Sequence, residues 1–258
     1  MRNSSETDYL VCGKGAKALV LLHGFIFDKN VWGVFSEELA HKYTLVLFDL
    51  PGHGSAPAFS EKSDFEDFAL HVREVMHDLG FATFSVVGHS MGGYAALALA
   101  TVFPMVVTSL VLINSTSFAD SEERKAQRLR TIELIKKSAS RFYHSFIPSL
   151  FRNQDDGKIT PLIARASNNN TEGIIRAIEV MRERKDYSET LSIMHIPILF
   201  YAGKFDCLIP EDHYTMVKAT LPHSEIVMSE HSAHMSFLEE PFHCAEAVTR
   251  FLEASPAC

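Results

Sequence analysis

The sequence of 258 residues predicts an α/β fold, with a doubly wound, mostly parallel sheet and an inserted all-helical cap. Two observations support this prediction. Short apolar runs alternate with helical patterns at both ends of the chain, which is typical of a parallel sheet covered on both faces. Between about residues 118 and 190, in contrast, helical patterns follow one another without a strand. We therefore expect a core of residues 1–118 and 191–258 and a cap of residues 119–190.

The individual elements are predicted from apolar runs and from helical spacing. Strands are expected at residues 18–22, 44–48, 84–87, 109–113, 198–201 and 225–228. Core helices are expected at residues 31–41, 64–79, 93–100, 211–221 and 241–253. In the cap, helical patterns cover residues 121–146, 161–168 and 171–185. We interpret this helical block as an insertion over the end of the sheet.

Charge and composition argue against several classes of protein. The chain has 24 basic and 32 acidic residues, a net charge of −8 and no polybasic run, which disfavours a nucleic acid or an anionic membrane as a partner. No stretch approaches the roughly 18 apolar residues that cross a bilayer, and the polar residues 1–8 do not resemble a signal peptide. The scattered Cys12, Cys207, Cys244 and Cys258 fit a reducing compartment. We expect a cytoplasmic protein, either a monomer or a homodimer.

The most informative motif is GHSMG at residues 88–92, which directly follows an apolar run and opens an Ala-rich helical stretch. A G-x-S-x-G pattern between a strand and a helix predicts a sharp turn that exposes the serine hydroxyl at the end of the sheet. Such a turn strains the backbone at Ser90 and needs small residues on both sides. Ser90 is therefore the expected nucleophile.

A serine hydroxyl needs a base that takes its proton and an acid that orients the base. Asp206 follows the strand at 198–201, and His234 lies after the strand at 225–228, so both are expected at the edge of the sheet where such sites lie. His231 is an alternative base, but His234 has the better spacing to the last helix. Glu211 and Asp212 are alternative acids, although the start of a helix already explains carboxylates at these positions.

Acyl transfer also needs N–H donors for the oxyanion of the tetrahedral intermediate. One donor is expected to be the backbone N–H of Met91, directly after the nucleophile, and the other the backbone N–H of Phe25. The histidines lack the spacing of a metal-binding motif, so we expect neither a metal nor a cofactor.

Five motifs in a fixed order carry a resemblance to a known family. They are LLHGF at 21–25, FDLPGHG at 48–54, GHSMGG at 88–93, GKFD at 203–206 and EHSAH at 230–234. With these motifs the chain resembles the α/β-hydrolase superfamily, in particular its small, capped, cofactor-free branch that is often labelled α/β fold hydrolase 1. The match runs from about residue 9 to residue 252. The resemblance implies an eight-stranded sheet with a cap between the sixth and seventh strands, and it supports the assignments of the triad and of the oxyanion donors.

The sequence departs from the family pattern in two places. Only residues 9–12 are available before the first buried strand, so we expect the usual leading antiparallel strand to be truncated or missing. Ala233 stands directly before the expected base, where many relatives have glycine. Neither departure removes a group that the chemistry needs.

These observations predict a serine hydrolase that cleaves a carboxylic ester, or a lactone or thioester, of a small molecule through an acyl-enzyme. Serine rather than aspartate at the nucleophile position argues against a dehalogenase or an epoxide hydrolase. An alternative is a carbon–carbon bond hydrolase, a lyase or a perhydrolase of the same fold that acts on a small metabolic acid. Candidate residues for binding such an acid are Arg124, Arg128, Arg130, Arg141 and Arg165. A ligand receptor on the same scaffold is a third possibility.

The cap is expected to determine specificity, because insertions over a rigid scaffold form the pocket. Its aromatic residues Phe142, Tyr143, Phe146 and Phe151 are candidates for binding the substrate, although ordinary packing within the cap is the favoured explanation for any one of them. Basic residues outnumber acidic residues in the cap, whereas acidic residues outnumber basic ones in the rest of the chain. This contrast hints at an acidic substrate, but a solvated helix surface explains it as well.

Overall fold

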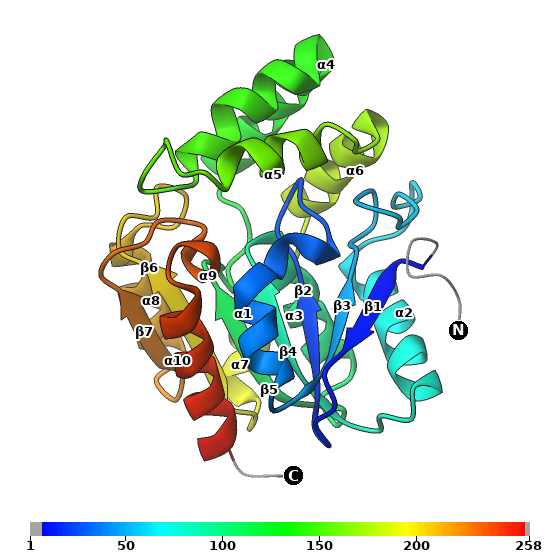
Figure 1. The fold of residues 1–258 in the computed structure, drawn as a ribbon, viewed down its shortest axis with the longest axis vertical. Helices are drawn as coiled ribbons and strands as arrows, with labels where there is room; N and C mark the ends of the chain where they lie inside the picture. The colour runs from blue at the N-terminus through cyan, green and yellow to red at the C-terminus, as the bar shows by residue number, and fades with distance from the viewer. Residues whose placement is uncertain (1–6, 256–258) are drawn as a thin grey trace.

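The computed structural model describes residues 7–255 and contains a seven-stranded sheet with helices on both faces (Figure 1). The strands are β1 (Tyr9–Cys12), β2 (Ala18–Leu22), β3 (Thr44–Phe48), β4 (Phe84–His89), β5 (Val107–Ile113), β6 (Ile198–Gly203) and β7 (Glu225–Ser229). Their spatial order is β1-β3-β2-β4-β5-β6-β7, and only β1 runs antiparallel to its neighbour. The predicted α/β fold with a mostly parallel sheet is confirmed.

The central strands are apolar along their length because helices cover them on both faces. All five residues of β2 and all six of β6 are buried. Val20 of β2 lies in register with Val46 of β3 and Val86 of β4, so branched side chains stack across the middle of the sheet. This rigid centre fixes the positions of the loops at the carboxyl ends of the strands.

The core helices form a layer on each face of the sheet. Helices α1 (Gly33–Ala40) and α10 (Pro241–Ala254) pack together on the face toward the viewer, and α2 (Phe65–Asp78) packs with α3 (Met91–Val102) on the other (Figure 1). The remaining core helices are the 3-10 helix η1 (Lys29–Trp32), α7 (Ser188–Ile193), α8 (Glu211–Thr220) and α9 (Ser236–Glu239). The sequence pattern did not predict α7 or α9, because four to six residues are too few to show helical periodicity.

The helical insertion lies above the carboxyl ends of the strands, between β5 and β6 (Figure 1). It contains α4 (Glu122–Ser149), α5 (Ile159–Ala166) and α6 (Thr171–Arg182), close to the three predicted helical patterns. Its two connections to the core are tied together, since the N–H of Tyr187 donates to the carbonyl of Ser117 over 2.9 Å. Helix α7 lies at the opposite end of the sheet in Figure 1. Because α7 spans residue 190, the structure does not mark a boundary there, and the cap limits at residues 119 and 190 stay a prediction.

The structure differs from the expected number of strands and extends the description of the N-terminal segment. The described residues form seven strands rather than eight, so the cap follows the fifth strand and not the sixth. The leading antiparallel strand, expected to be truncated or missing, is present as the four-residue β1, whose register pairs Tyr9 with Phe48. Two of the interpretations from sequence concern residues that the structure does not describe. Residues 1–6, part of the segment that does not resemble a signal peptide, lie outside the described residues, and so does Cys258. Within residues 7–255, no helix combines the length and the apolar character needed to cross a membrane.

Candidate active site

Ser90 sits on a strained turn between β4 and α3. Its backbone has φ 50° and ψ −115°, a conformation that L-residues rarely adopt. The turn is tight enough to exclude side chains on both sides. A Cβ on Gly88 would lie 2.4 Å from the carbonyl oxygen of Gly92, and a Cβ on Gly92 would lie 1.9 Å from the carbonyl oxygen of Leu22. The fold therefore requires glycine at both positions and holds the Ser90 hydroxyl at the start of α3.

Ser90, His234 and Asp206 form a continuous hydrogen-bonded row. The Nε2 atom of His234 lies 3.0 Å from Oγ of Ser90, and its Nδ1 atom lies 2.8 Å from Oδ2 of Asp206. With the proton on Nδ1 donated to the carboxylate, Nε2 is the acceptor for the serine hydroxyl. The side chains of His234 and Asp206 are almost fully buried. The structure thus brings together the three residues that the sequence proposed.

Four N–H donors surround the carboxylate of Asp206. Besides His234, Oδ2 accepts from Nδ2 of Asn114 over 2.9 Å, and Oδ1 accepts from the backbone N–H groups of Leu208 at 2.8 Å and Ile209 at 3.1 Å. Burial alone raises the pKa of Asp206, but the charge on His234 and these hydrogen bonds outweigh it. The pKa therefore lies below its ordinary value, and the carboxyl stays ionised at neutral pH.

Asn114 is a site residue that the sequence reasoning missed. It directly follows β5, has a positive φ of 46°, and also donates to the carbonyl of Ala233 over 3.1 Å. Its side-chain oxygen accepts a short hydrogen bond from the hydroxyl of Ser236. The available signal was its place at the carboxyl end of a predicted strand, next to the ends that carry the other polar groups.

The backbone of His234 is held from two directions. Its N–H donates to the carbonyl of Leu150, at the end of cap helix α4, over 3.0 Å. Its carbonyl accepts from Nε2 of His89 over 2.9 Å. Burial and the nearby charge of His234 lower the pKa of His89 to about 3, so this ring is neutral and serves as a fixed donor.

The alternative residues lie elsewhere. His231 is exposed and its carbonyl accepts from the guanidinium of Arg152 over 3.3 Å. Glu211 and Asp212 are exposed in the first turn of α8. Among the described residues, none of the three candidates has a hydrogen bond to Ser90, His234 or Asp206.

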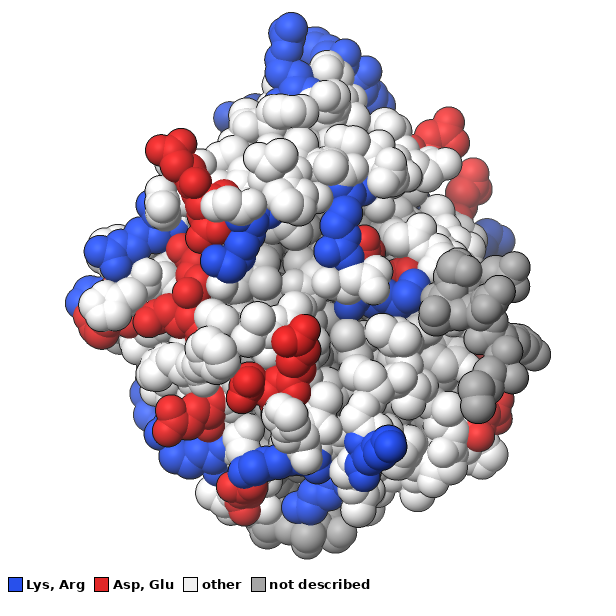
Figure 2. Space-filling model, in the orientation of Figure 1, with Lys and Arg blue, Asp and Glu red and all other residues white. Residues whose placement is uncertain are grey.

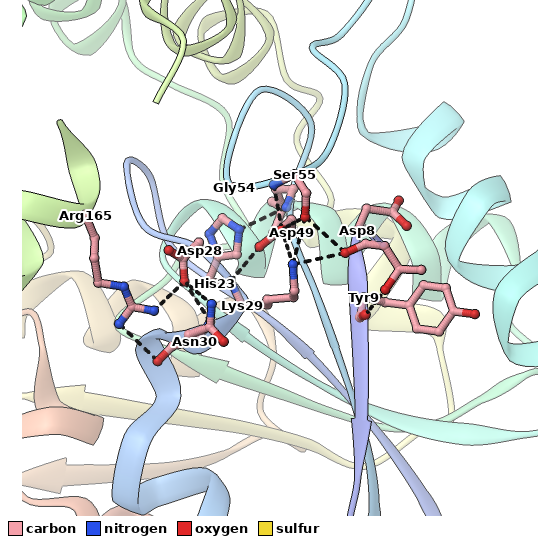
Figure 3. A network of polar contacts seen from close by, with 12 residues as sticks. Asp8, Tyr9, His23, Asp28, Lys29, Asn30, Asp49, Gly54, Ser55 and Arg165 are labelled. Carbon is pink, nitrogen blue, oxygen red and sulfur yellow. Dashed lines mark hydrogen bonds and ion pairs between the residues drawn. The ribbon is translucent and has the colours of Figure 1, made fainter. Parts of the chain in front are cut away.

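On the side of the core, buried charged groups hold the loop that contains Phe25 in place. The Nζ atom of Lys29 pairs with Oδ2 of Asp49 over 2.6 Å, and its backbone N–H donates to Oδ1 over 2.7 Å. The N–H of Ser55 donates to the same carboxylate over 2.8 Å. Figure 3 shows these groups turned toward one another, with His23 beside them. Nε2 of His23 accepts the N–H of Leu50 over 2.9 Å, so this histidine also has a structural partner.

The cap holds the same loop from above. Nη2 of Arg165 in α5 pairs with Asp28 over 2.7 Å (Figure 3), and Nδ2 of Asn169 donates to the carbonyl of Ile26 over 2.8 Å. Ile26 has a positive φ of 65°, which a β-branched residue adopts only when its surroundings enforce it. The residue next to Phe25 is therefore fixed by a side chain from the cap, a contact across 143 positions of sequence that no local pattern reveals.

A cavity of about 200 Å³ lies over the serine, between the core and the cap. Ser90, His89 and His234 line it together with Phe25, and cap helix α4 contributes several residues. The cap residues fall into an apolar group and a polar group. The apolar group is Phe142, Phe146 and Leu150 at or near the end of α4 with Ile178 and Met181 of α6, and the polar group is Arg124, Gln127, Arg128 and Thr131 of α4. Ser90 therefore faces a partly open cavity that has room for a small organic molecule.

The predicted aromatic residues of the cap do not all reach this cavity. Phe142 and Phe146 stack with ring centroids 5.0 Å apart and line it. Tyr143 and Phe151 are buried but do not belong to the lining. The ring of Tyr143 packs against that of Phe142 inside the cap, with centroids 5.8 Å apart. Within residues 7–255, no group of three or more His, Cys, Asp or Glu side chains is arranged to hold a metal ion.

Comparison with known proteins identifies the family. The family model described as alpha/beta hydrolase fold matches residues 17–241, most of the chain, so the protein belongs to this family. A pimeloyl-(acyl-carrier protein) methyl ester esterase from Yersinia pseudotuberculosis serotype IB is 24% identical over 255 residues, covering 95% of this chain and 96% of the relative.

Solved structures show the same fold. A thermophilic esterase from Thermogutta terrifontis has a TM-score of 0.88 and 25% identity, covering 96% of this chain and 93% of its own. The enol-lactonase from Burkholderia xenovorans LB400 has a TM-score of 0.85 at 19% identity, with 95% of each chain covered. The resemblance to the α/β-hydrolase superfamily is thus confirmed, and the protein has a hydrolase fold with esterases among its relatives.

Proposed function

We propose that this protein is a serine hydrolase that cleaves a carboxylic ester, or a related lactone or thioester, of a small molecule. The observation that carries the proposal is the hydrogen-bonded row of Ser90, His234 and Asp206 beneath a cavity between the core and the cap. Oγ of Ser90 attacks the ester carbonyl carbon while Nε2 of His234 takes the hydroxyl proton. The tetrahedral intermediate then expels the alcohol, which receives that proton from His234. Water, deprotonated by the same nitrogen, attacks the acyl-enzyme and releases the acid.

Two backbone N–H groups are proposed to bind the oxyanion. Met91 is the first residue of α3, so its N–H has no partner within the helix. Among the described residues, neither this N–H nor that of Phe25 has a backbone acceptor. Donors of this kind contribute about 3–4 kcal/mol each to transition-state stabilisation when they are held in place. The clamps on the Phe25 loop supply that rigidity on one side, and the start of α3 supplies it on the other.

The relatives support ester hydrolysis over the alternatives. Two of the proteins described above are named esterases, and one of these shares 96% of its length with this chain. A carbon–carbon bond hydrolase, a lyase or a receptor has no comparable support from a feature of the site. We therefore keep ester hydrolysis as the proposed reaction, with a small-molecule substrate.

A series of 4-nitrophenyl esters from acetate to palmitate tests the proposal. We expect the wild-type protein to release 4-nitrophenolate fastest from acyl chains of about two to six carbons, because a cavity of about 200 Å³ is smaller than the roughly 300–1,000 Å³ of most ligand pockets. The measurement is kcat/KM for each ester from absorbance. Absence of release above the rate in buffer for every ester would contradict ester hydrolysis, and an optimum at palmitate would contradict the assigned cavity.

A further inference from the structure

One face of α4 turns polar groups toward the cavity. Arg124, Gln127, Arg128 and Thr131 have the spacing i, i+3, i+4 and i+7, which places them on the same side of a helix. All four line the cavity. Apolar residues are expected at this spacing where a helix faces a core, so the polar face marks this part of the cap as a binding surface.

A break in α4 separates this polar face from an apolar one. Ser138 has non-helical angles, φ −169° and ψ 98°, and divides the helix into two parts. The second part contributes Phe142, Phe146 and Leu150 to the same cavity. One cap helix therefore supplies guanidinium groups from its first part and apolar side chains from its second. A ligand that matches this lining has an apolar portion and an anionic portion.

The guanidinium groups are not balanced by carboxylates in the cavity. No Asp or Glu belongs to the lining, as far as the described residues show. Arg128 donates to Asp120 over 2.8 Å, but Asp120 is shared, because Arg184 pairs with it over 2.5 Å. Both partners are buried, and Asp186 lies near enough to Arg184 to interact with its charge. The acids behind the wall thus compensate Arg128 and Arg184 and leave Arg124 without a carboxylate.

Arg124 is the guanidinium most available to a ligand. Among the described residues, its side chain makes one hydrogen bond, to the neutral Oε1 of Gln127 over 3.3 Å. It is half-buried between the cavity over Ser90 and a neighbouring hollow that it also lines. Figure 2 shows that Lys and Arg side chains gather over α4, at the top of the molecule. The positive field of the cap therefore continues from its surface to the cavity wall.

We infer that the substrate is an ester that carries a free carboxylate, such as the half-ester of a short dicarboxylic acid. The inference rests on the proposed function and specifies its substrate class. Arg124 binds the carboxylate while the ester carbonyl lies at Ser90. A planar guanidinium presents two parallel N–H donors that match a carboxylate. For a half-buried guanidinium such as Arg124, this pair is stronger than at the open surface because water screens it less.

Two matched methyl esters test this inference. Monomethyl adipate has a carboxylate at the far end, and methyl 6-methylheptanoate has an isopropyl group of the same shape there. We expect kcat/KM of the wild type to be at least about tenfold higher for the half-ester. The Arg124→Gln variant should lose about 10- to 100-fold on the half-ester, the range for a hydrogen bond to a charged group, and less than about twofold on the isopropyl ester.

Arg130→Gln is the control for the change of charge, because Arg130 lies on the same helix, is exposed and does not line the cavity. We expect this variant to hydrolyse both esters like the wild type. A wild type that prefers the isopropyl ester would overturn the inference. An Arg124→Gln variant that loses the same factor on both esters would overturn it too, because that result assigns Arg124 a structural role only.

Binding to the Ser90→Ala variant separates this inference from the proposed function. Isothermal titration calorimetry with monomethyl adipate measures affinity without chemistry. We expect binding that weakens about tenfold or more when Arg124→Gln is added. If no ester is hydrolysed but this binding is seen, the proposed function fails and the carboxylate site stands. If esters are hydrolysed but the dissociation constant is the same with and without Arg124, the carboxylate site fails and the proposed function stands.

Discussion

Replacement of Ser90 by alanine is expected to lower kcat for 4-nitrophenyl acetate by about 10⁴-fold or more. The variant keeps the cavity and the N–H donors but has no oxygen that can form the acyl-enzyme. Its row ends at His234, whose Nε2 atom then has no hydroxyl at 3.0 Å. Residual hydrolysis would come only from water that the remaining groups orient. The measurement is the steady-state release of 4-nitrophenolate, with unfolding midpoints recorded for both proteins.

Ser85→Ala is the matched control. Ser85 lies on the same strand, β4, and its hydroxyl bonds to that of Thr108 over 2.9 Å, away from the cavity lining. We expect this variant to keep kcat within about twofold, in line with the small effect of most changes at partly exposed positions. Hydrolysis that is equally fast in the Ser90→Ala variant and the wild type would show that another group is the nucleophile.

Replacement of Asp206 by asparagine is expected to lower kcat by about 10⁴-fold with little change in KM. The four N–H donors around this side chain determine how the asparagine amide would be oriented. The asparagine oxygen would face the backbone donors of Leu208 and Ile209, which places its NH₂ group against Nδ2 of Asn114 and Nδ1 of His234. Nδ1 of His234 would then have to accept a hydrogen bond, so the ring proton would move to Nε2. A protonated Nε2 cannot take the proton from serine.

Asp212→Asn is the control for this change. Asp212 is exposed in the first turn of α8, six positions further along the chain, and has no contact with the histidine among the described residues. We expect its kcat to equal that of the wild type within about twofold. The comparison uses initial rates at saturating ester, with the fold checked by circular dichroism. An Asp206→Asn variant that keeps more than a tenth of wild-type kcat would refute the orienting role of the carboxylate.

The cap is coupled to the catalytic groups through backbone contacts. Leu150 at the end of α4 accepts the N–H of His234, and Asn169 holds the carbonyl of Ile26, beside the proposed oxyanion donor Phe25. A shift of the cap would therefore displace both the base and the oxyanion loop. Because small errors in position cost large factors in rate, we propose that these contacts give the cap a part in catalysis.

The residues of the row were predictable from sequence because each follows a strand. Ser90, Asp206 and His234 are read from short apolar runs and the turns after them, and parallel strands bring those turns to one edge of the sheet. Asn114 has the same position but no motif around it. Asn169 lies in the cap and reaches the core only through the folded path of α5 and α6, so no local pattern reports its contact with Ile26.

The lining of the cavity was less predictable, for a geometric reason. Phe142, Tyr143 and Phe146 look equivalent in the sequence, yet only the first and the last line the cavity. The face that a helix presents depends on its rotation, and the break at Ser138 resets that rotation in the middle of α4. The sequence offered five candidate arginines for binding an acid, and only the structure shows that Arg124 and Arg128 are the two that line the cavity.

The most direct test of the central claim is the site at which a fluorophosphonate probe attaches. Such probes form a covalent bond with an activated serine and mimic the tetrahedral intermediate. We predict one adduct per chain, on Ser90 as located by peptide mass spectrometry, and a loss of ester hydrolysis in proportion to labelling. Full inhibition with Ser90 unmodified, or an adduct on Ser90 with hydrolysis intact, would contradict the account.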